Sequence, residues 1–273
     1  MAILSTDKTI RLIELFGGIG SQAQALKNIG ANFEHYRLVE FDKYPVASYN
    51  AIHGTDFKTQ DICKTHAEDL GIVDKDTYQY LLTYSFPCQD LSVAGKGAGM
   101  KRGSGTRSGL LWEVERILKE CNESGALPDV LLMENVPQVH GKKNLEDFNE
   151  WLAFLESIGY YNIWTDINAK DMGVAQNRNR CFCVSVLGGK PGCYEFPKPV
   201  PLTKVMADYL DDVVDEKYYI NTVKAQQLID KLISEGKLED VENGWDKQCP
   251  SCHPWVRLSV SAYWLQGRPC RCV

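Results

Sequence analysis

The chain has 273 residues, of which 44% are hydrophobic, and a formal net charge of -6. This length is enough to bury the core of one large domain, or of one domain with a partial second. The N-terminal residues carry no apolar run long enough for a signal peptide, and no stretch reaches the roughly 20 apolar residues of a membrane helix. We therefore expect a cytoplasmic protein whose ten cysteines are mostly free thiols rather than a disulfide framework.

Apolar runs alternate with helical periodicities through the first 190 residues, a pattern typical of strand-helix-strand units around a parallel sheet. Strands are predicted over residues 9–16, 36–40, 80–84 and 129–133, and helices over residues 21–29, 110–121 and 145–155. The first helix is expected to bury Ala25, Leu26 and Ile29. The expected fold class is α/β.

The pattern changes after residue 190, where prolines at positions 191, 197, 199 and 201 interrupt regular structure. One amphipathic helix follows, from Ala225 to Ile233, and Gly236 ends it. Two domains are therefore expected: residues 1–190, and a smaller, partial C-terminal region of residues 191–273.

A glycine-rich turn follows the first predicted strand, with the sequence Gly18-Ile19-Gly20-Ser21-Gln22-Ala23, and Glu40 ends the next strand. The glycines let the backbone approach a ligand, and the acid can accept both hydroxyls of a ribose. Taken alone, this pattern favours a nicotinamide or flavin dinucleotide. S-adenosylmethionine carries the same ribose and adenine, so a similar pocket serves it. Asp61 can accept from the adenine amine while Ile62 covers the ring, although Asp61 can equally be a solvated loop acid.

Three later constellations carry reactive groups: Pro87-Cys88-Gln89, Glu134-Asn135-Val136 and Gln176-Asn177-Arg178-Asn179-Arg180. A thiolate can add to carbon 6 of cytosine, a carboxylic acid can hold ring nitrogen 3 and the exocyclic amine, and an arginine can grip the ring carbonyl. Each group alone is weak evidence, because a Pro-Cys pair is usually structural and an arginine pair often lies on a surface strand. A dehydrogenase, however, has no need of all three.

In this order the motifs resemble those of the DNA cytosine-5 methyltransferases of the bacterial or phage restriction-modification type. The resemblance rests on Phe16-Gly17-Gly18-Ile19-Gly20, Glu40, Asp61-Ile62 and the three constellations above, and covers roughly residues 9–190. It implies a Rossmann-like S-adenosylmethionine-dependent methyltransferase sheet with helices on both faces. It also implies transfer of a methyl group from S-adenosylmethionine to carbon 5 of cytosine in double-stranded DNA, with no obligatory protein partner and no catalytic metal.

The resemblance implies a role for each matching residue. Cys88 is the expected nucleophile, Glu134 the group at ring nitrogen 3, and Arg180 the partner of the cytosine carbonyl. The expected catalytic set is completed by Gln89, Asn135 and Arg178. The expected cofactor pocket consists of Phe16, Gly18, Ile19, Gly20, Glu40, Asp61, Ile62 and Pro87. Because the reacting carbon is hidden in a stacked duplex, the target base is expected to be flipped into the site.

A basic, glycine-rich segment, residues 95–107, follows Cys88 and contains no acid. Glycines supply hinges and cations supply phosphate contacts, so this segment is expected to be a mobile catalytic loop on DNA. The alternative is an ordinary solvated loop. The expected nucleic-acid-binding residues are Lys96, Lys101, Arg102, Arg107 and Gln176.

The C-terminal part departs from the family, because the final motif, a helix that packs near the cofactor pocket, is not recognisable. Cys249, Cys252, Cys270 and Cys272 could form a zinc site, but an unligated tail is favoured. The expectation is a weak or inactive enzyme with poor solubility. Two alternatives remain open: an RNA (tRNA) cytosine-5 methyltransferase, and an inactive, truncated methyltransferase fragment.

Overall fold

The computed structural model describes residues 4–5, 7–91, 99–209, 211, 215 and 222–236. Lys96 and the four cysteines considered for zinc (Cys249, Cys252, Cys270 and Cys272) lie outside the described residues, as does the final C-terminal motif. The chain divides into two compact units. The first comprises Met1–Ile167 and Asn179–Pro197, and the second comprises Asn168–Arg178 and Lys198–Val273.

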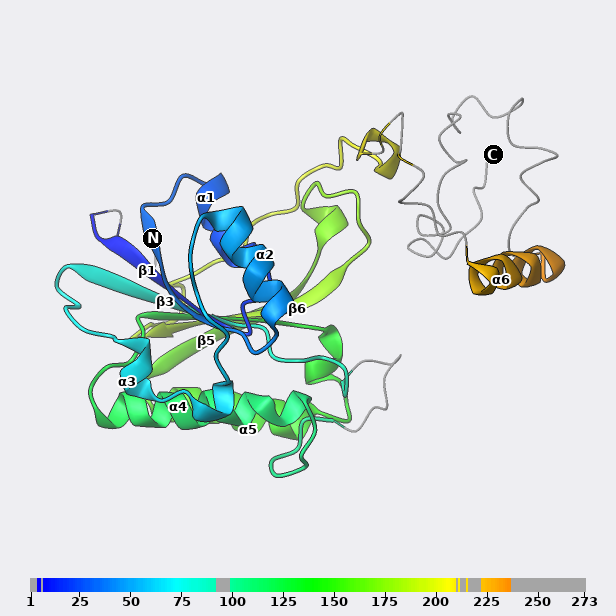
Figure 1. Ribbon diagram of the computed structural model, residues 1–273. Coiled ribbons are helices and arrows are strands. Elements are labelled where there is room, and N and C mark those ends of the chain that lie inside the picture. Colours follow the sequence, from blue (N-terminus) through cyan, green and yellow to red (C-terminus); the bar gives the residue numbers. More distant parts are fainter. Residues whose placement is uncertain are drawn as a thin grey trace. The chain divides into compact units, whose positions relative to one another are not determined.

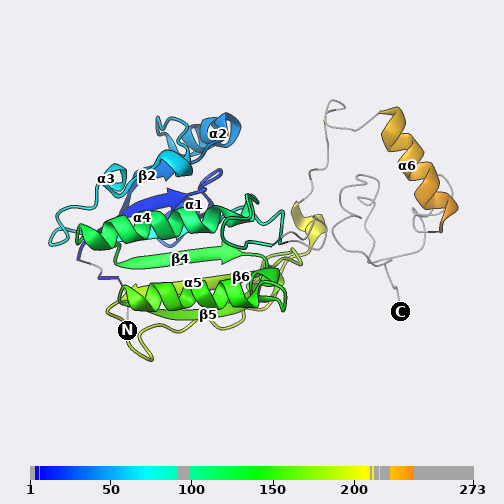
Figure 2. The same cartoon turned by 90° about the horizontal axis from the view of Figure 1, so that it is seen from below.

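The first unit is built on a six-stranded sheet (Figures 1 and 2), with the strand order β2-β1-β3-β4-β6-β5. The strands are β1 (Thr9–Leu15), β2 (Phe33–Val39), β3 (Tyr78–Tyr84), β4 (Val130–Asn135), β5 (Tyr160–Asn168) and β6 (Asn179–Leu187). Strand β1 pairs in parallel with β2 and β3, and β3 pairs in parallel with β4. Strand β6 is antiparallel to β4. The carboxyl ends of β1 to β4 and the beginning of β6 therefore share one edge of the sheet.

Helices cover both faces of this sheet, as expected. Helices α1 (Ser21–Asn28) and α2 (Lys43–His53) lie on one face, and α4 (Leu111–Glu123) and α5 (Leu145–Ser157) lie on the other (Figures 1 and 2). The short helix α3 (Ala67–Leu70) precedes β3. Strand residues alternate between two buried clusters, because successive side chains of a strand point to opposite faces. Leu12 and Leu38 pack with Tyr49 of α2, whereas Ile13 and Leu82 belong to the cluster of α4 and α5.

The predicted strands and helices of this unit are confirmed, but the predicted buried face of α1 is wrong at two positions. Ala23 is fully buried, whereas Ala25 is exposed and Ile29 is 77% exposed. Helix α1 ends at Asn28, so Ile29 already lies beyond it, and the short helix packs through Ala23 and Leu26. Helix α2 was not predicted, because only Val46 and Tyr49 of its eleven residues are buried and the apolar periodicity is weak.

The described residues of the second unit form two 3-10 helices, an isolated β-bridge and one α-helix. A 3-10 helix, η4 (Ala169–Asp171), lies in the first segment, and Met172 forms a parallel bridge with Val200. Another 3-10 helix, η5 (Met206–Tyr209), precedes helix α6 (Val223–Ser234), which confirms the helix predicted there. Within the described parts of the chain, no helix combines the length and the apolar composition that crossing a membrane requires.

Candidate active site

The glycine-rich turn leaves the carboxyl end of β1 through residues of unusual backbone conformation. Phe16 has φ 57°, a left-handed value that is uncommon for a residue with a side chain. Its amide donates to the carbonyl of Val39 at 2.7 Å, which ties the turn to the end of β2. Gly20 has φ 83° and begins α1, and a Cβ there would collide with His53 and Tyr49. Only glycine therefore fits at position 20.

Glu40, directly after β2, closes the turn with its carboxylate. One oxygen accepts from the amide of Gly18 at 3.1 Å, and the other accepts from the amide of Asp42 at 3.0 Å. Each carboxylate oxygen has a second lone pair, so Glu40 can still accept two further hydrogen bonds. A Cβ on Gly18 would meet nothing within 4 Å, so the space beside the turn is open. This arrangement fits the two hydroxyls of a ribose.

Two exposed apolar side chains belong to this region, one in the glycine-rich turn and one directly after Glu40. Ile19 is 53% exposed and Phe41 is 75% exposed. Large apolar groups are exposed at a cost, and at a ligand site they offer a surface for an aromatic ring. Phe41 was missed by the sequence reasoning, although an aromatic residue directly after a strand-end acid was a usable signal. The turn, Glu40 and these two side chains are therefore the residues that could hold S-adenosylmethionine.

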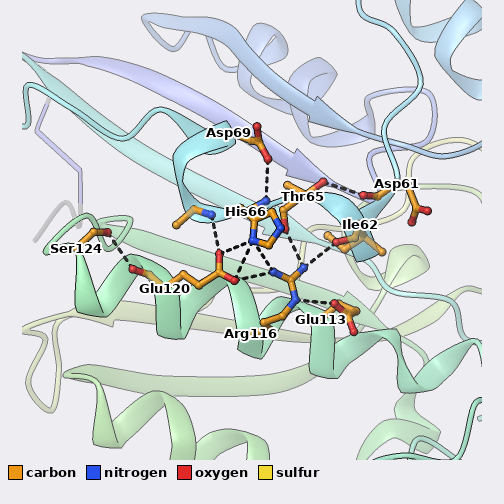
Figure 3. Close-up of polar contacts among 10 residues, drawn as sticks. Asp61, Ile62, Thr65, His66, Asp69, Glu113, Arg116, Glu120 and Ser124 are labelled. Atoms are coloured by element: carbon orange, nitrogen blue, oxygen red, sulfur yellow. Dashed lines mark hydrogen bonds and ion pairs between the residues drawn. The ribbon is translucent and has the colours of Figure 1, made fainter.

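Asp61 and Ile62 lie in the segment that α4 holds in place (Figure 3). The Asp61 carboxylate accepts from the amide of Cys63 at 3.0 Å and so caps the 3-10 helix η1 (Ile62–Lys64). Ile62 is only 5% exposed and its carbonyl accepts from the guanidinium of Arg116 at 3.1 Å. The same guanidinium nitrogen donates to the carbonyl of Thr65 at 2.8 Å. The segment that carries Asp61 is therefore anchored to α4.

Arg116 owes its orientation to two acids of its own helix. Its Nε lies 2.8 Å from a Glu113 oxygen, and its Nη1 lies 2.8 Å from a Glu120 oxygen. The guanidinium plane is thus fixed while its remaining donors reach the η1 segment (Figure 3). The sequence reasoning missed Arg116, because it belongs to no motif and its partners lie 54 and 51 positions away along the chain.

Beneath the glycine-rich turn lies a buried polar network centred on Glu14. The Tyr49 hydroxyl donates to a Glu14 oxygen at 2.5 Å. The hydroxyl proton is therefore used, so the Tyr49 oxygen accepts from Nδ1 of His35, which lies 2.8 Å away. His53 Nε2 lies 3.1 Å from the carbonyl of Ile19 and donates to it. Burial raises the pKa of Glu14 to about 7, since the charged form is poorly solvated there.

Cys88 lies in the loop after β3, half-buried against the core, and the next residue, Gln89, is exposed. The Ser108 hydroxyl donates to the carbonyl of Pro87 at 2.6 Å, and the Ser108 amide donates to the carboxylate of Asp90 at 3.1 Å. These bonds tie the loop of Cys88 to the 3-10 helix η2 (Ser108–Leu110) that precedes α4. The nucleophile expected from the sequence thus sits on a braced loop.

The end of β4 supplies a second brace and the acid. Asn135, 2% exposed, donates to the carbonyl of Phe86 at 3.0 Å and accepts from the amide of Val136 at 2.8 Å. Glu134 Oε1 lies 2.9 Å from Nε of Arg180, and both side chains are 21% exposed. The antiparallel pairing of β4 with β6 causes this meeting, because it sets the start of β6 beside the end of β4. The loop of Cys88, Glu134 and Arg180 therefore occupy one edge of the sheet.

Gln176 and Arg178 belong to the second unit, so the predicted arginine motif is divided between the two units. Gln176 is half-buried and Arg178 is exposed. The Arg178 amide donates to the side chain of Asn168 at 3.1 Å, and its carbonyl accepts from the amide of Ala169 at 2.9 Å. These bonds close the turn that separates β5 from β6.

Within the described part of the basic loop, Lys101, Arg102 and Arg107 are all exposed. Arg102, however, has partners inside the unit. Its guanidinium lies 2.5 Å from a Glu115 oxygen, 2.8 Å from a Glu150 oxygen and 4.0 Å from the ring centre of Trp112. This geometry favours Arg102 as an anchor of the loop and leaves Lys101 and Arg107 as the better candidates for phosphate contacts.

Comparison with known proteins agrees with this geometry. Residues 10–248 match the sequence profile of the C-5 cytosine-specific DNA methylases, so the match extends past residue 190, where the motif resemblance was expected to fade. The type II methyltransferase M2.ScrFI of Lactococcus lactis subsp. cremoris is 33% identical over 87% of this chain and 77% of that protein. The orphan methyltransferase M.SssI of Spiroplasma monobiae is 35% identical over 79% of this chain and 68% of that protein.

Solved structures show the same fold. The Dnmt2 methyltransferase of S. pombe superposes with a TM-score of 0.62 at 21% identity, over 82% of this chain and 66% of that one. A putative DNA modification methyltransferase encoded within a prophage of E. coli gives a TM-score of 0.57 at 22% identity, over 76% of this chain and 56% of that one. The chain belongs to the C-5 cytosine-specific DNA methylase family, whose members methylate cytosine in DNA and use S-adenosylmethionine.

Proposed function

We propose that this chain transfers the methyl group to carbon 5 of a flipped cytosine in double-stranded DNA while Cys88 is covalently bound to carbon 6. The observation that carries the proposal is the arrangement at one edge of the sheet. There the hydrogen bond from Asn135 to the carbonyl of Phe86 links the loop of Cys88 to β4, and Glu134 forms an ion pair with Arg180. A thiol, a carboxyl and a guanidinium at one sheet edge match the demands of this reaction.

The chemistry begins with the low reactivity of carbon 5, where attack on an electrophile would break the aromatic ring. The Cys88 thiolate forms a bond to carbon 6 and pushes an electron pair toward carbon 5, while Glu134 hydrogen-bonds or protonates ring nitrogen 3. S-adenosylmethionine, when bound, supplies the methyl group that carbon 5 takes up. A base or water then removes the proton from carbon 5, and the thiolate of Cys88 leaves as the ring becomes aromatic again.

Arg180 has donors for both of its proposed partners. Its Nε faces Glu134 and its Nη1 donates to the carbonyl of Asn179 at 2.7 Å, which leaves further N–H groups for the cytosine carbonyl. The ion pair also keeps Glu134 oriented before the base enters. Arg178 and Gln176 of the second unit complete the motif as proposed contacts to the nucleic acid.

The cofactor site follows from the turn after β1 and the end of β2. We assign the ribose hydroxyls to Glu40 and the adenine amine to Asp61, with Ile19, Phe41 and Ile62 as the apolar surface for the ring. The backbone of Phe16, Gly18, Gly20 and Pro87 forms the remaining wall. The lone pairs left on Glu40 and the open space beside Gly18 support this assignment.

Trapping of a covalent adduct tests the proposal. A mixed-sequence DNA duplex containing 5-fluorocytosine, incubated with S-adenosylmethionine, should give a denaturation-resistant complex with the wild type, since the fluorine cannot leave as a proton does. Cys88→Ala should give none, and Cys193→Ala, which removes a half-buried thiol outside the proposed site, should trap as the wild type does. Equal trapping by Cys88→Ala would contradict the assignment, and trapping only by an RNA of the same sequence would favour the RNA reading.

A further inference from the structure

Three metal-ligating side chains meet on the first unit and take no part in the proposed reaction. His140 ends the 3-10 helix η3 (Pro137–His140), Asp166 lies on β5 and Cys181 lies on β6. Nε2 of His140 lies 2.9 Å from a carboxylate oxygen of Asp166, and one ligand atom from each residue lies within 4.8 Å of the other two. Segments that are distant in the sequence thus present nitrogen, oxygen and sulfur donors to one point.

The surroundings favour a built site over a chance surface cluster. Cys181 is fully buried, and the side chains of His140 and Asp166 are only 23% and 32% exposed. The ring of His140 is packed by aromatic groups, with ring centres 4.7 Å from Trp164 and 6.1 Å from Phe148. Packing of this kind restricts the direction in which its Nε2 points.

We propose that His140, Asp166 and Cys181 bind a thiophilic divalent metal ion of the Zn²⁺ type, with water as a fourth ligand. The donor set suits this class, because Zn²⁺ accepts thiolate, imidazole and carboxylate together, whereas Mg²⁺ and Ca²⁺ prefer oxygen ligands. Ligand atoms around tetrahedral Zn²⁺ lie roughly 3.5 Å apart, so the cluster has to contract by about 1 Å.

The charges and protons balance on binding. The thiol of Cys181 loses its proton to solvent, and His140 coordinates through Nε2 with its proton on Nδ1. One thiolate and one carboxylate then neutralise the two positive charges of the ion. The metal would join η3, which begins two residues after Asn135, to β5 and β6. Since Cys181 is paired with Asn135 in the β4–β6 ladder, the ion would stiffen the sheet edge that carries Glu134 and Arg180.

Co²⁺, a spectroscopic substitute for Zn²⁺, tests the site in the full-length protein after removal of metal by a chelator. The wild type should bind one equivalent at this site, with thiolate-to-cobalt charge-transfer absorption and the visible bands of a tetrahedral complex. Cys181→Ala should lose one equivalent of Co²⁺ together with the absorption that this equivalent contributes, and His140→Gln should weaken its binding by more than about 10-fold. Cys183→Ala is the matched control, because Cys183 is equally buried two residues further along β6 and should leave the spectrum unchanged. The C-terminal cysteines are present in every variant and contribute equally to each.

Co²⁺ titrations of Cys181→Ala and His140→Gln that match the wild type in stoichiometry and spectrum would overturn the proposal and leave only an ion pair between His140 and Asp166. Circular dichroism of each variant checks that it folds. If Cys181→Ala does not fold, His140→Gln decides the question, since its change lies nearer the surface. Metal binding is read independently of methylation, so Cys88→Ala should keep the Co²⁺ site even if the proposed reaction is wrong.

Discussion

Glu40 illustrates how one side chain can serve the fold and the ligand together. Its carboxylate already accepts from the amides of Gly18 and Asp42, and each oxygen keeps a second lone pair for a ligand. We expect Glu40→Ala to weaken the binding of S-adenosylhomocysteine by about 10- to 150-fold, because a hydrogen bond to a charged group contributes about 1.5–3 kcal/mol. Isothermal calorimetry measures the affinity. The control is Asp56→Ala, which removes an exposed acid, and an unchanged affinity in Glu40→Ala would remove Glu40 from the site.

Because Glu14 is buried, we expect the free energy of unfolding to depend on pH. Burial raises its pKa from an ordinary value of 4.5 to about 7, so the folded protein holds this proton more tightly than the unfolded chain does. The stabilising contribution is therefore complete below pH 4.5 and is lost as the pH rises to about 7. In Glu14→Gln the amide oxygen can still accept from Tyr49 and no charge forms.

We expect the wild type to lose about 3 kcal/mol of unfolding free energy relative to Glu14→Gln across that pH interval. Urea unfolding of both proteins, at the two ends of the interval, measures the difference. Parallel pH dependence in the two proteins would show that Glu14 does not titrate in this range. Groups common to both proteins cancel in the comparison.

At the level of helices and strands, α4 acts as the support of the cofactor pocket. Arg116 links α4 to the segment of Asp61 through the carbonyls of Ile62 and Thr65. We expect Arg116→Ala to weaken S-adenosylhomocysteine binding by about 10-fold, because the segment loses its charge-assisted hydrogen bonds and Asp61 is no longer held in place. Arg116→Lys should restore the affinity only in part, since a lysine cannot reproduce the planar set of donors.

The matched control for this prediction is Glu123→Ala, an exposed change at the end of the same helix. Its affinity should equal that of the wild type. Thermal unfolding of each variant separates a loss of affinity from a loss of folded protein. Wild-type affinity in a fully folded Arg116→Ala protein would show that α4 does not position Asp61.

For the whole molecule, the net charge of -6 means that DNA binding has to depend on local cations. We propose Lys101 and Arg107 as phosphate contacts, while Arg102 is engaged with Glu115 and Glu150. Replacing Lys101 and Arg107 with alanine should reduce the slope of log affinity against log salt by about 1 for each residue. Fluorescence anisotropy at several salt concentrations measures the slope.

Arg102→Ala serves as the contrast. It should lower the free energy of unfolding, because Arg102 pairs with acids inside the unit, but it should leave the salt slope nearly unchanged. Lys58→Ala, an exposed lysine outside the loop, should change neither quantity appreciably. A salt slope that stays at the wild-type value in the Lys101 and Arg107 variants would show that the loop does not contact phosphates.

Much of the fold could be predicted from the sequence, because strands and helices leave local patterns. The strands before Phe16 and Cys88, and helices α4 and α5, follow from runs and periodicities within a few residues. The positions of the turn glycines and of Glu40 could also be predicted, because each directly follows a strand and the ends of parallel strands share one edge of the sheet. Helix α2 and the buried face of α1 were missed where the apolar pattern is short or weak.

The contacts that complete the candidate site required the tertiary structure. The antiparallel insertion of β6 beside β4 brings Arg180 to Glu134, and strand pairing of this kind has no signature in either strand alone. The partners of Arg102 and Arg116, and the meeting of His140, Asp166 and Cys181, join residues from separate elements. The sequence by itself thus determines the order and the chemical type of the reactive side chains, because these side chains belong to local motifs. Which side chains meet is decided by how strands pair and helices pack, because those contacts join residues that are far apart along the chain.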